Sequence, residues 1–340
     1  MPASFLEFCQ QALARPALLV TVLLLCAVIL VNGWTDAPNA IATAVTTGVV
    51  PFRAAAAGAA VCNLLGVVCA AAANTSVAQT IYAIADFGGG TERALAALCA
   101  AMTAIVLWAA GAWRFGIPTS ESHALAAGIA GAALALPGGV SNLRPGPWGR
   151  VLLGLVLSVV LGFLGGALAA RALPGGGRSG LYSGGQVLGA GASAFLHGAQ
   201  DGQKFLGVFL LGASLSQGRP DSETFLLPAW LPLLCALLMG LGTLLGGRRI
   251  VENVGRNLVP LTPRLGFAAD LGSAASLLLC TLLGLPASTT HTKTAAILGA
   301  GGGRRANRRA AGSIALAWVC TFPGCGLIAF VTARGFLALL

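Results

Sequence analysis

Two short polar segments, each set inside a long apolar stretch, constrain this chain more than any other feature. Residues 32–39 read NGWTDAPN and residues 197–204 read HGAQDGQK, so Gly33 matches Gly198 and Asp36 matches Asp201. An ionisable group at membrane depth costs roughly 3 kcal/mol on insertion scales, and chains keep one there mainly to handle ions or polar substrates. The two segments therefore predict a functional site inside a membrane protein rather than a polar loop at its surface.

The two polar segments also carry polar side chains at matching ends. Asn32 stands opposite His197, and Asn39 stands opposite Lys204. Lys204 follows Asp201 by three residues, so on a helix the ammonium and the carboxylate would share a face. A buried ammonium beside a carboxylate costs far less than either group alone. The alternative is that the Lys204 side chain reaches out to the membrane interface.

A hydroxyl-rich segment follows each polar segment. Residues 116–123 read GIPTSESH and residues 284–291 read GLPASTTH. The aspartate and the histidine are separated by 123 − 36 = 87 residues in the first half and by 291 − 201 = 90 in the second. Two motifs repeated in one order at nearly one spacing indicate an internal duplication. We divide the chain into a first repeat at 1–140, a connecting span with Gly/Pro-rich loops at 141–185, and a second repeat at 186–340.

The composition of the chain excludes a soluble domain. Of its 340 residues, 56% are hydrophobic and 9% are charged, whereas soluble chains carry about 25% charged residues. The net charge of +10 then reflects basic loops of a membrane protein rather than a nucleic-acid partner. Because about 20 apolar residues cross a bilayer, the apolar runs indicate about 10–12 membrane helices or half-helices. We therefore expect an all-α polytopic fold.

Two interruptions of the apolar runs predict broken or re-entrant hairpin regions. Pro38 disturbs the first polar segment, and such a break is tolerated only where it is buried or lines a cavity. The runs on either side of Pro286 are short, and they predict either a re-entrant hairpin or two short spans. Both alternatives place the basic segments 248–264 and 304–309 on one side, which the positive-inside rule makes cytoplasmic. Sparse charge at the matching flanks of the first half favours an inverted repeat.

Each hydroxyl-rich segment would open a helix whose first backbone N–H groups are free. Helix capping explains one such segment alone. Two equivalent segments favour a functional explanation, because two helix starts that meet at the midplane of the membrane form an oxyanion site. The hydroxyl donors expected there are Ser120, Ser122, Ser288, Thr289 and Thr290.

The carboxylates predict cation coupling. Asp36 and Asp201 would repel a free oxyanion, so we expect them to bind a co-transported cation or to carry protons. Oxyanion donors combined with carboxylates predict symport. Glu121 occurs only in the first half, where it stands opposite Thr289. It is either a proton carrier or a group in water at the mouth of the path.

Two further polar residues in apolar runs have structural explanations. Asn63 predicts an interhelical hydrogen bond. Asp270 lies close to a basic segment and predicts a pair with an arginine. The nine cysteines show no spacing typical of a zinc site or of a disulfide framework.

Taken together, these motifs resemble the inorganic phosphate transporter (PiT) family. The resemblance runs from about Ala27 to Phe330 and includes LTP at 261–263, GFAAD at 266–270 and TKT at 292–294. It implies an inverted repeat with a transport domain against a scaffold domain, a homodimer, and symport of orthophosphate with sodium or protons. It also implies that Asp36, Asn39 and Asp201 are cation and substrate ligands, which would form the sodium site if sodium is the coupling ion.

The resemblance assigns the remaining polar residues as well. The hydroxyl donors would line the phosphate site together with Asn39, Gln200 and Lys204. We expect a supporting role for Asn32, His123, His197, His291 and Lys293. Thr35 and Gln200 stand where many members have Asn or His, and Lys204 replaces the Asn of sodium-coupled members. This last departure favours protons over sodium.

The function that we expect is secondary active symport of inorganic phosphate across a bacterial inner membrane, without enzymatic activity. The expected partners are phosphate and the lipid bilayer, and no cofactor is expected besides a co-transported H⁺ or Na⁺. A sulfate permease of the same family is the alternative. An intramembrane hydrolase is a remote alternative, because a nucleophile needs one base in one site, whereas Ser and His occur twice here in equivalent places.

Overall fold

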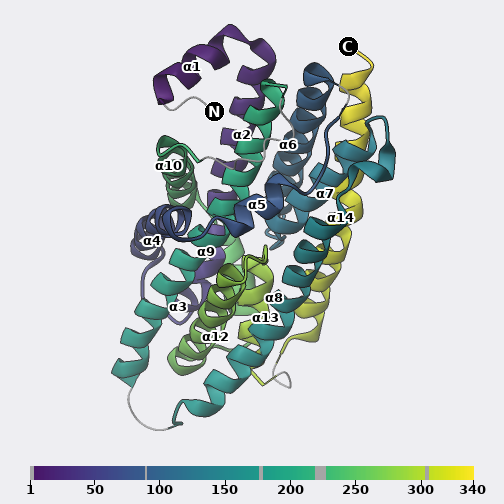
Figure 1. Cartoon of the computed structure of the whole chain (residues 1–340). Coiled ribbons are helices and arrows are strands. Elements are labelled where there is room, and N and C mark those ends of the chain that lie inside the picture. The colour runs from purple at the N-terminus through teal and green to yellow at the C-terminus, as the bar shows by residue number, and fades with distance from the viewer. Residues whose placement is uncertain (1–3, 89, 176–178, 219–226, 303–305) are drawn as a thin grey trace.

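The structure is a computed structural model that describes residues 4–88, 90–175, 179–218, 227–302 and 306–340. These residues are almost entirely helical, and the helices pack side by side with both termini at one end of the bundle (Figure 1). Six described helices are long and apolar enough to cross a membrane. The chain is therefore an all-α, multi-pass membrane protein, as predicted.

The described helices are α1 (Phe5–Ala14), α2 (Pro16–Thr35), η1 (Ala37–Ile41), α3 (Ala42–Thr46), α4 (Phe52–Ala73), α5 (Ser76–Tyr82), α6 (Thr91–Arg114), α7 (Glu121–Leu134), η2 (Gly139–Asn142), α8 (Pro145–Ala172), α9 (Ser179–Ser216), α10 (Trp230–Leu245), α11 (Arg248–Asn257), α12 (Pro263–Leu282), α13 (Thr289–Ala300) and α14 (Arg308–Leu337).

The first polar segment breaks a helix, as its proline predicted. Helix α2 ends at Thr35, and the chain continues through the 3₁₀ helix η1 into α3. Pro38 has no N–H to donate and its ring obstructs an α-helical turn, so the backbone tightens there. All five residues of η1 are buried, which satisfies the condition for an irregular backbone inside a membrane protein.

The second polar segment, in contrast, lies within the continuous helix α9. This helix has 38 residues, or about 57 Å at 1.5 Å per residue, and contains no proline. The stretch up to Gly185, which we expected to be a loop, is helical from Ser179. A Cβ at Gly185 would lie 3.0 Å from the ring of Phe267. The glycines expected to form a loop thus let α9 pack closely on α12.

Between residues 74 and 91, a stretch too polar to be an apolar span, the structure contains the short helix α5. Val77, Ala78 and Ile81 are buried in the core, and α5 packs against α9. The apolar residues of this short helix are too few to stand out as a membrane span, so the sequence pattern hides it.

Two re-entrant hairpins carry the hydroxyl-rich segments. The α6–α7 hairpin enters and leaves at one end, because the Asp86 N–H donates to the Asn142 carbonyl at 2.7 Å. The α12–α13 hairpin does the same, because the Asn307 N–H donates to the Leu258 carbonyl at 2.9 Å. The latter contact puts the described parts of the two basic segments at one end, as both alternatives for the stretch around Pro286 predicted. In Figure 1 the two hairpins enter from opposite ends of the bundle.

The two halves exchange helices with each other. Helix α7 of the first half packs on α14, and α13 of the second half packs on α8. Likewise α2 packs on α10, and α9 packs on α4. The contacts thus form reciprocal pairs, and α2 and α9 start at opposite ends of the bundle (Figure 1).

Glycines at equivalent positions allow these crossings. A Cβ at Gly33 would lie 2.2 Å from the carbonyl oxygen of Met239, and a Cβ at Gly198 would lie 2.2 Å from that of Asn63. Small residues let membrane helices approach closely. The glycine of each polar segment thus sets the spacing between the helix that carries the aspartate and a helix of the other half.

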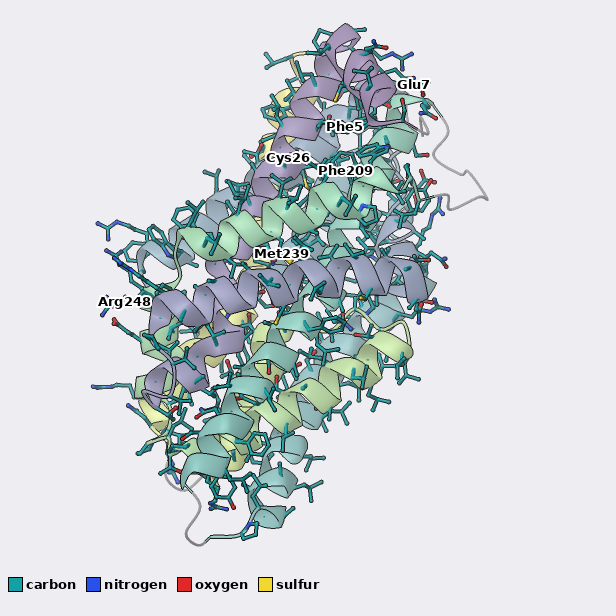
Figure 2. The ribbon with its side chains drawn as sticks, turned by 90° about the vertical axis from the view of Figure 1, so that its left-hand side faces the viewer. Phe5, Glu7, Cys26, Phe209, Met239 and Arg248 are labelled. Atoms are coloured by element: carbon teal, nitrogen blue, oxygen red, sulfur yellow. The ribbon has the colours of Figure 1, made fainter. Side chains whose placement is uncertain are left out.

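Helix α1 packs onto the end of the bundle through aromatic rings. The ring centroids of Phe5 and Phe8 lie 5.4 and 4.9 Å from that of Trp230. Figure 2 shows Phe5 and Phe209 near this end, while Arg248 lies far away toward the other end with its side chain pointing outward.

Candidate functional site

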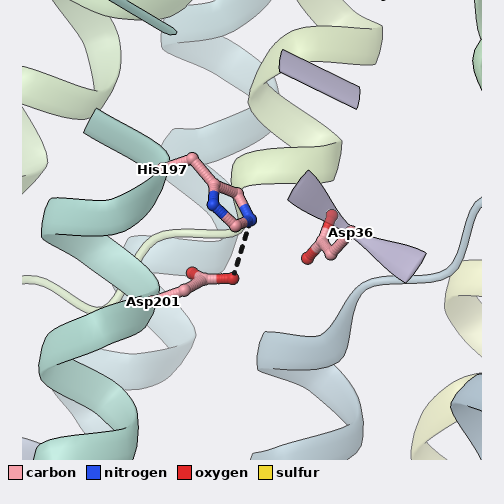
Figure 3. Close-up of side chains that lie close together, drawn as sticks. All are labelled: Asp36, His197 and Asp201. Carbon is pink, nitrogen blue, oxygen red and sulfur yellow. Dashed lines mark ion pairs between the residues drawn. The ribbon is translucent and has the colours of Figure 1, made fainter. Parts of the chain in front are cut away.

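The carboxylates of the two polar segments meet inside the bundle together with one imidazole. Asp36, His197 and Asp201 each offer one ligand atom, and these three atoms lie within 4.8 Å of one another. Each of the three residues is about 1% exposed. Figure 3 shows Asp36 at the end of α2 facing His197 and Asp201 on α9. Two segments far apart in the sequence therefore form one buried polar cluster.

Asp36 is held by donors from both halves. The Asn39 amide donates to its Oδ1 at 2.9 Å, and the Thr290 hydroxyl donates to the same oxygen. The Thr289 hydroxyl reaches Oδ2 at 3.4 Å. The carboxylate of the first half is thus bound by the start of α13 in the second half.

Asp201 is likewise held by donors from both halves. The Lys204 ammonium lies 2.5 Å from Oδ1, and the Asn32 amide donates to Oδ2 at 2.9 Å. The ammonium also donates to the Ser122 hydroxyl at 2.6 Å and to the Ala287 carbonyl. Lys204 is 1% exposed, so the predicted pair with Asp201 is confirmed and the interfacial alternative is wrong.

The two predicted helix starts face each other. Ser120 caps α7 and Ser288 caps α13, and each hydroxyl accepts the backbone N–H three residues later, at 3.3 and 3.2 Å. The two hydroxyl oxygens lie 2.7 Å apart. Both serines are fully buried, so the tips of the hairpins meet beside the carboxylate cluster.

Glu121 is buried next to the cluster rather than exposed at a mouth. It is 3% exposed, and its Oε1 accepts the Thr35 hydroxyl. Its Oε2 has no hydrogen-bond partner among the described residues. The alternative that Glu121 lies in water at the mouth of the path is therefore wrong. Its role as a proton carrier stays a prediction.

Gln200 lies at the edge of the site, where it holds a hairpin tip. Its amide donates to the Thr281 hydroxyl at 2.9 Å, and its oxygen accepts the Ala287 N–H at 3.1 Å. The predicted contact of Gln200 with phosphate therefore competes with bonds that fix the segment leading into α13.

The histidines of the two hairpins stack on each other behind the serines. The ring centroids of His123 and His291 are 4.3 Å apart, and His291 lies 3.7 Å from the ring of Trp318. These ring contacts pack the tips of the two hairpins against each other and against α14.

Asp270 pairs with a lysine and not with an arginine, which corrects the prediction. Its Oδ1 binds the Lys293 ammonium and accepts the Thr43 hydroxyl at 2.7 Å. The adjacent Arg264 donates instead to the carbonyls of Ala170 and Leu173 at 2.8 and 2.9 Å. The reason is that free carbonyls at the end of α8 attract the arginine, while α13 brings Lys293 to Asp270 inside the bundle.

Two contacts made by residues of the candidate site could not be expected from the sequence. Asn63 donates to the Thr243 hydroxyl at 3.1 Å, as predicted, but its oxygen also lies 3.1 Å from Nδ1 of His197. The Ser158 hydroxyl accepts the Ser288 N–H at 2.8 Å. Asn63 was visible as a lone polar group in an apolar span, whereas Ser158 had no local signal because serine is common in membrane helices.

This chain is similar to known proteins along most of its length. A profile of the phosphate transporter family matches residues 32–176 and again residues 175–329. A probable low-affinity inorganic phosphate transporter of Rhizobium meliloti is 37% identical over 308 residues, covering 87% of this chain and 90% of that protein. One of Mycobacterium leprae is 33% identical, covering 88% of this chain and 73% of that protein.

The fold is also found among solved structures. A structure described as the sodium-dependent phosphate transporter aligns with a TM-score of 0.85 at 21% identity, covering 96% of this chain and all of that chain. The two profile matches together span nearly the whole length from the first polar segment to α14. The chain therefore belongs to the phosphate transporter family, the PiT family that its motifs resemble.

Proposed function

We propose that this protein carries inorganic phosphate across a bacterial inner membrane by symport, with protons favoured over sodium as the coupling ion. The observation that carries the proposal is the meeting of two donor-rich helix starts beside two buried carboxylates. Helix starts and hydroxyls suit a tetrahedral oxyanion, and the carboxylates suit a cation or a proton. The names of the relatives support phosphate as the anion.

The contacts of Asp36 suggest how coupling works. The hydroxyls of Thr289 and Thr290 donate their hydrogen bonds to the carboxylate of Asp36, so they cannot donate to a phosphate at the same time. A carboxylate accepts such bonds more strongly when it is ionised. Protonation of Asp36 therefore weakens its hold on these hydroxyls and frees them to donate to a phosphate oxygen. A phosphate and a proton then bind more tightly together than either binds alone.

The contacts of Lys204 favour protons over sodium in the second half. Its ammonium already lies against Asp201, Ser122 and the Ala287 carbonyl, where a metal cation would need the same oxygens. The fixed charge neutralises Asp201 and also lies near the start of α7, where it attracts a phosphate. In the first half the matching residue is the neutral Asn39.

The same proposal includes the architecture that the family resemblance implies. The opposite directions of α2 and α9 and the opposed hairpins (Figure 1) support an inverted repeat. The resemblance adds that a transport domain moves against a scaffold domain around the site. A homodimer follows from the resemblance alone.

The experiment is uptake of radiolabelled phosphate into proteoliposomes under an imposed proton or sodium gradient. We expect uptake to follow the proton gradient, to be inhibited strongly by arsenate, which has nearly the shape and charge of phosphate, and to be inhibited weakly by sulfate. Sulfate that competes better than arsenate would instead establish the sulfate permease. Uptake that requires sodium and ignores a proton gradient would refute proton coupling.

A further inference from the structure

The second lysine of the chain lies in a charged cluster that shares no residue with the Asp36–Asp201 cluster. Lys293 and Lys204 are the only lysines in the sequence, and Lys293 is 2% exposed. Its ammonium binds Oδ1 of Asp270, the Ala40 carbonyl at 3.0 Å and the Ser193 hydroxyl at 3.3 Å. Four different helices, α13, α12, η1 and α9, thus supply the lysine and its three partners.

The two lysines have the same set of partners. Each ammonium is surrounded by one carboxylate, one hydroxyl and one backbone carbonyl, which for Lys204 are Asp201, Ser122 and Ala287. Carbonyls freed from regular helices, together with side-chain oxygens, are what membrane transporters use to coordinate sodium. Ala40 belongs to η1, the irregular segment that follows Asp36. Each ammonium group is therefore surrounded by three oxygen atoms. Oxygen atoms surround a small monovalent cation in the same way.

The first half shows that the fold does not require this charged pair. The hydroxyl-rich segments align Gly116 with Gly284, an offset of 284 − 116 = 168. At that offset Lys293 corresponds to Leu125 and Asp270 corresponds to Met102. Leu125 and Met102 are buried in the hydrophobic core. Both charges are thus present in one half and both are absent from the other.

An ion pair in an apolar interior is a poor way to stabilise a fold. Replacing a buried ion pair by apolar side chains of similar volume is often neutral or stabilising, and the first half has such side chains. Asp270 moreover keeps Oδ2 without a hydrogen-bond partner among the described residues, although it is 0% exposed. A carboxylate that is kept at this cost, with one oxygen unused, points to ion handling rather than to packing.

We propose that Asp270, Ser193 and the Ala40 carbonyl form a monovalent-cation site in which the Lys293 ammonium is a tethered cation. Removal of the ammonium leaves the oxygen ligands in place, and a sodium ion can then bind between them. The site is distinct from the Asp36–Asp201 cluster. The proposal does not depend on the coupling ion of phosphate transport.

The test is the thermal stability of the purified full-length protein in sodium chloride and in choline chloride of equal ionic strength. Lys293→Ala removes the ammonium and leaves room for an ion, whereas Lys293→Met removes the charge but fills much of the space. A ligand that binds only the folded state raises Tm. We expect sodium to raise the Tm of Lys293→Ala by roughly 2 °C or more beyond any rise that it causes in the wild type and in Lys293→Met.

Two double variants complete the design. Lys293→Ala/Asp270→Asn keeps the space but lacks the carboxylate, so its sodium effect should be lost. Lys293→Leu/Asp270→Met copies the side chains of the first half, so it should fold in either salt and show no sodium effect. The Tm measurement uses no phosphate, so its result can contradict the cation site without contradicting the proposal of phosphate transport.

The outcomes decide the proposal even if Lys293→Ala is unstable. Recovery of folded Lys293→Ala in sodium but not in choline would support the site as strongly as a rise in Tm. No sodium effect in folded Lys293→Ala, or an equal effect in Lys293→Met or in Lys293→Ala/Asp270→Asn, would overturn it. A third outcome would also overturn the proposal: folded Lys293→Ala is recovered in neither salt, while Lys293→Leu/Asp270→Met is recovered normally. Sodium would then have failed to replace the ammonium.

Discussion

The hydroxyl oxygens of Ser120 and Ser288 lie 2.7 Å apart, although 168 residues separate the two serines in the sequence. Each serine caps the short helix of a hairpin, and the hairpins enter the bundle from opposite ends (Figure 1). The pair thus marks the point where the two halves of the molecule touch at the centre of the site.

This proximity predicts a disulfide in Ser120→Cys/Ser288→Cys. Two side chains whose terminal atoms are in contact fall within the reach of a disulfide. We expect mild oxidation to link the two positions, detected by mass spectrometry of the joined peptides, and a reductant to release them. Either single variant should give no such peptide. Absence of the link in the folded double variant would contradict the meeting of the two tips.

Removing the charge of either central carboxylate should impair coupled uptake. Asp36→Asn and Asp201→Asn keep the shape of the side chain but weaken charge-assisted hydrogen bonds that contribute about 1.5–3 kcal/mol each. We expect gradient-driven phosphate uptake to fall by about ten-fold or more. Asp86→Asn is the matched control, because that carboxylate is 41% exposed and pairs with Arg144 in a loop. Normal uptake by both central variants would rule out their role in coupling.

Lys204→Ala should depress phosphate uptake and stability together. It leaves the Asp201 carboxylate buried without its ammonium, and breaking such a pair costs about 3–5 kcal/mol. Arg248→Ala is the control, because that side chain is 74% exposed and its loss should change little. Lys204→Asn copies Asn39 of the first half and should introduce a sodium dependence of uptake. The membership of Lys204 in the site would be refuted by a Lys204→Ala protein that transports normally.

Gly33→Ala and Gly198→Ala should each destabilise the protein. The new methyl group would meet a backbone carbonyl at 2.2 Å in either case, and forced overpacking costs about 1–3 kcal/mol. Gly58→Ala is the control in helix α4, since no atom lies within 4 Å of its Cβ position. Thermal unfolding in detergent measures the difference. Equal Tm values for all three variants would show that these helices have room to separate.

The sequence predicted the parts of the site that duplication makes visible. The recurrence of Asp36 as Asp201, at the same position of two repeated segments, was enough to expect that they act together. The pattern could not predict which helix supplies a partner. Asp270 was assigned to an arginine near it in sequence, but its partner Lys293 is brought to it by the packing of α13.

Local pattern also failed where the two copies of a motif behave differently. Asp36 lies at a break and Asp201 lies in a continuous helix, and only Pro38 gave a sign of this difference. The histidine pair was predicted to support the site, but the stacking of His123 on His291 depends on two hairpins that meet tip to tip. Such contacts arise from the three-dimensional arrangement and leave no trace in the periodicity of one helix.

The exchange of helices between the halves has a consequence for how such a protein came to exist. Because α7 rests on α14 and α13 rests on α8, half of this chain has no partner for its own hairpin. A shorter ancestor with one copy of each motif would have built this site only as an antiparallel pair of identical chains, inserted in both orientations in the same membrane. In a single chain, by contrast, the two copies of each position are free to differ, as Lys204 differs from Asn39 and Lys293 differs from Leu125.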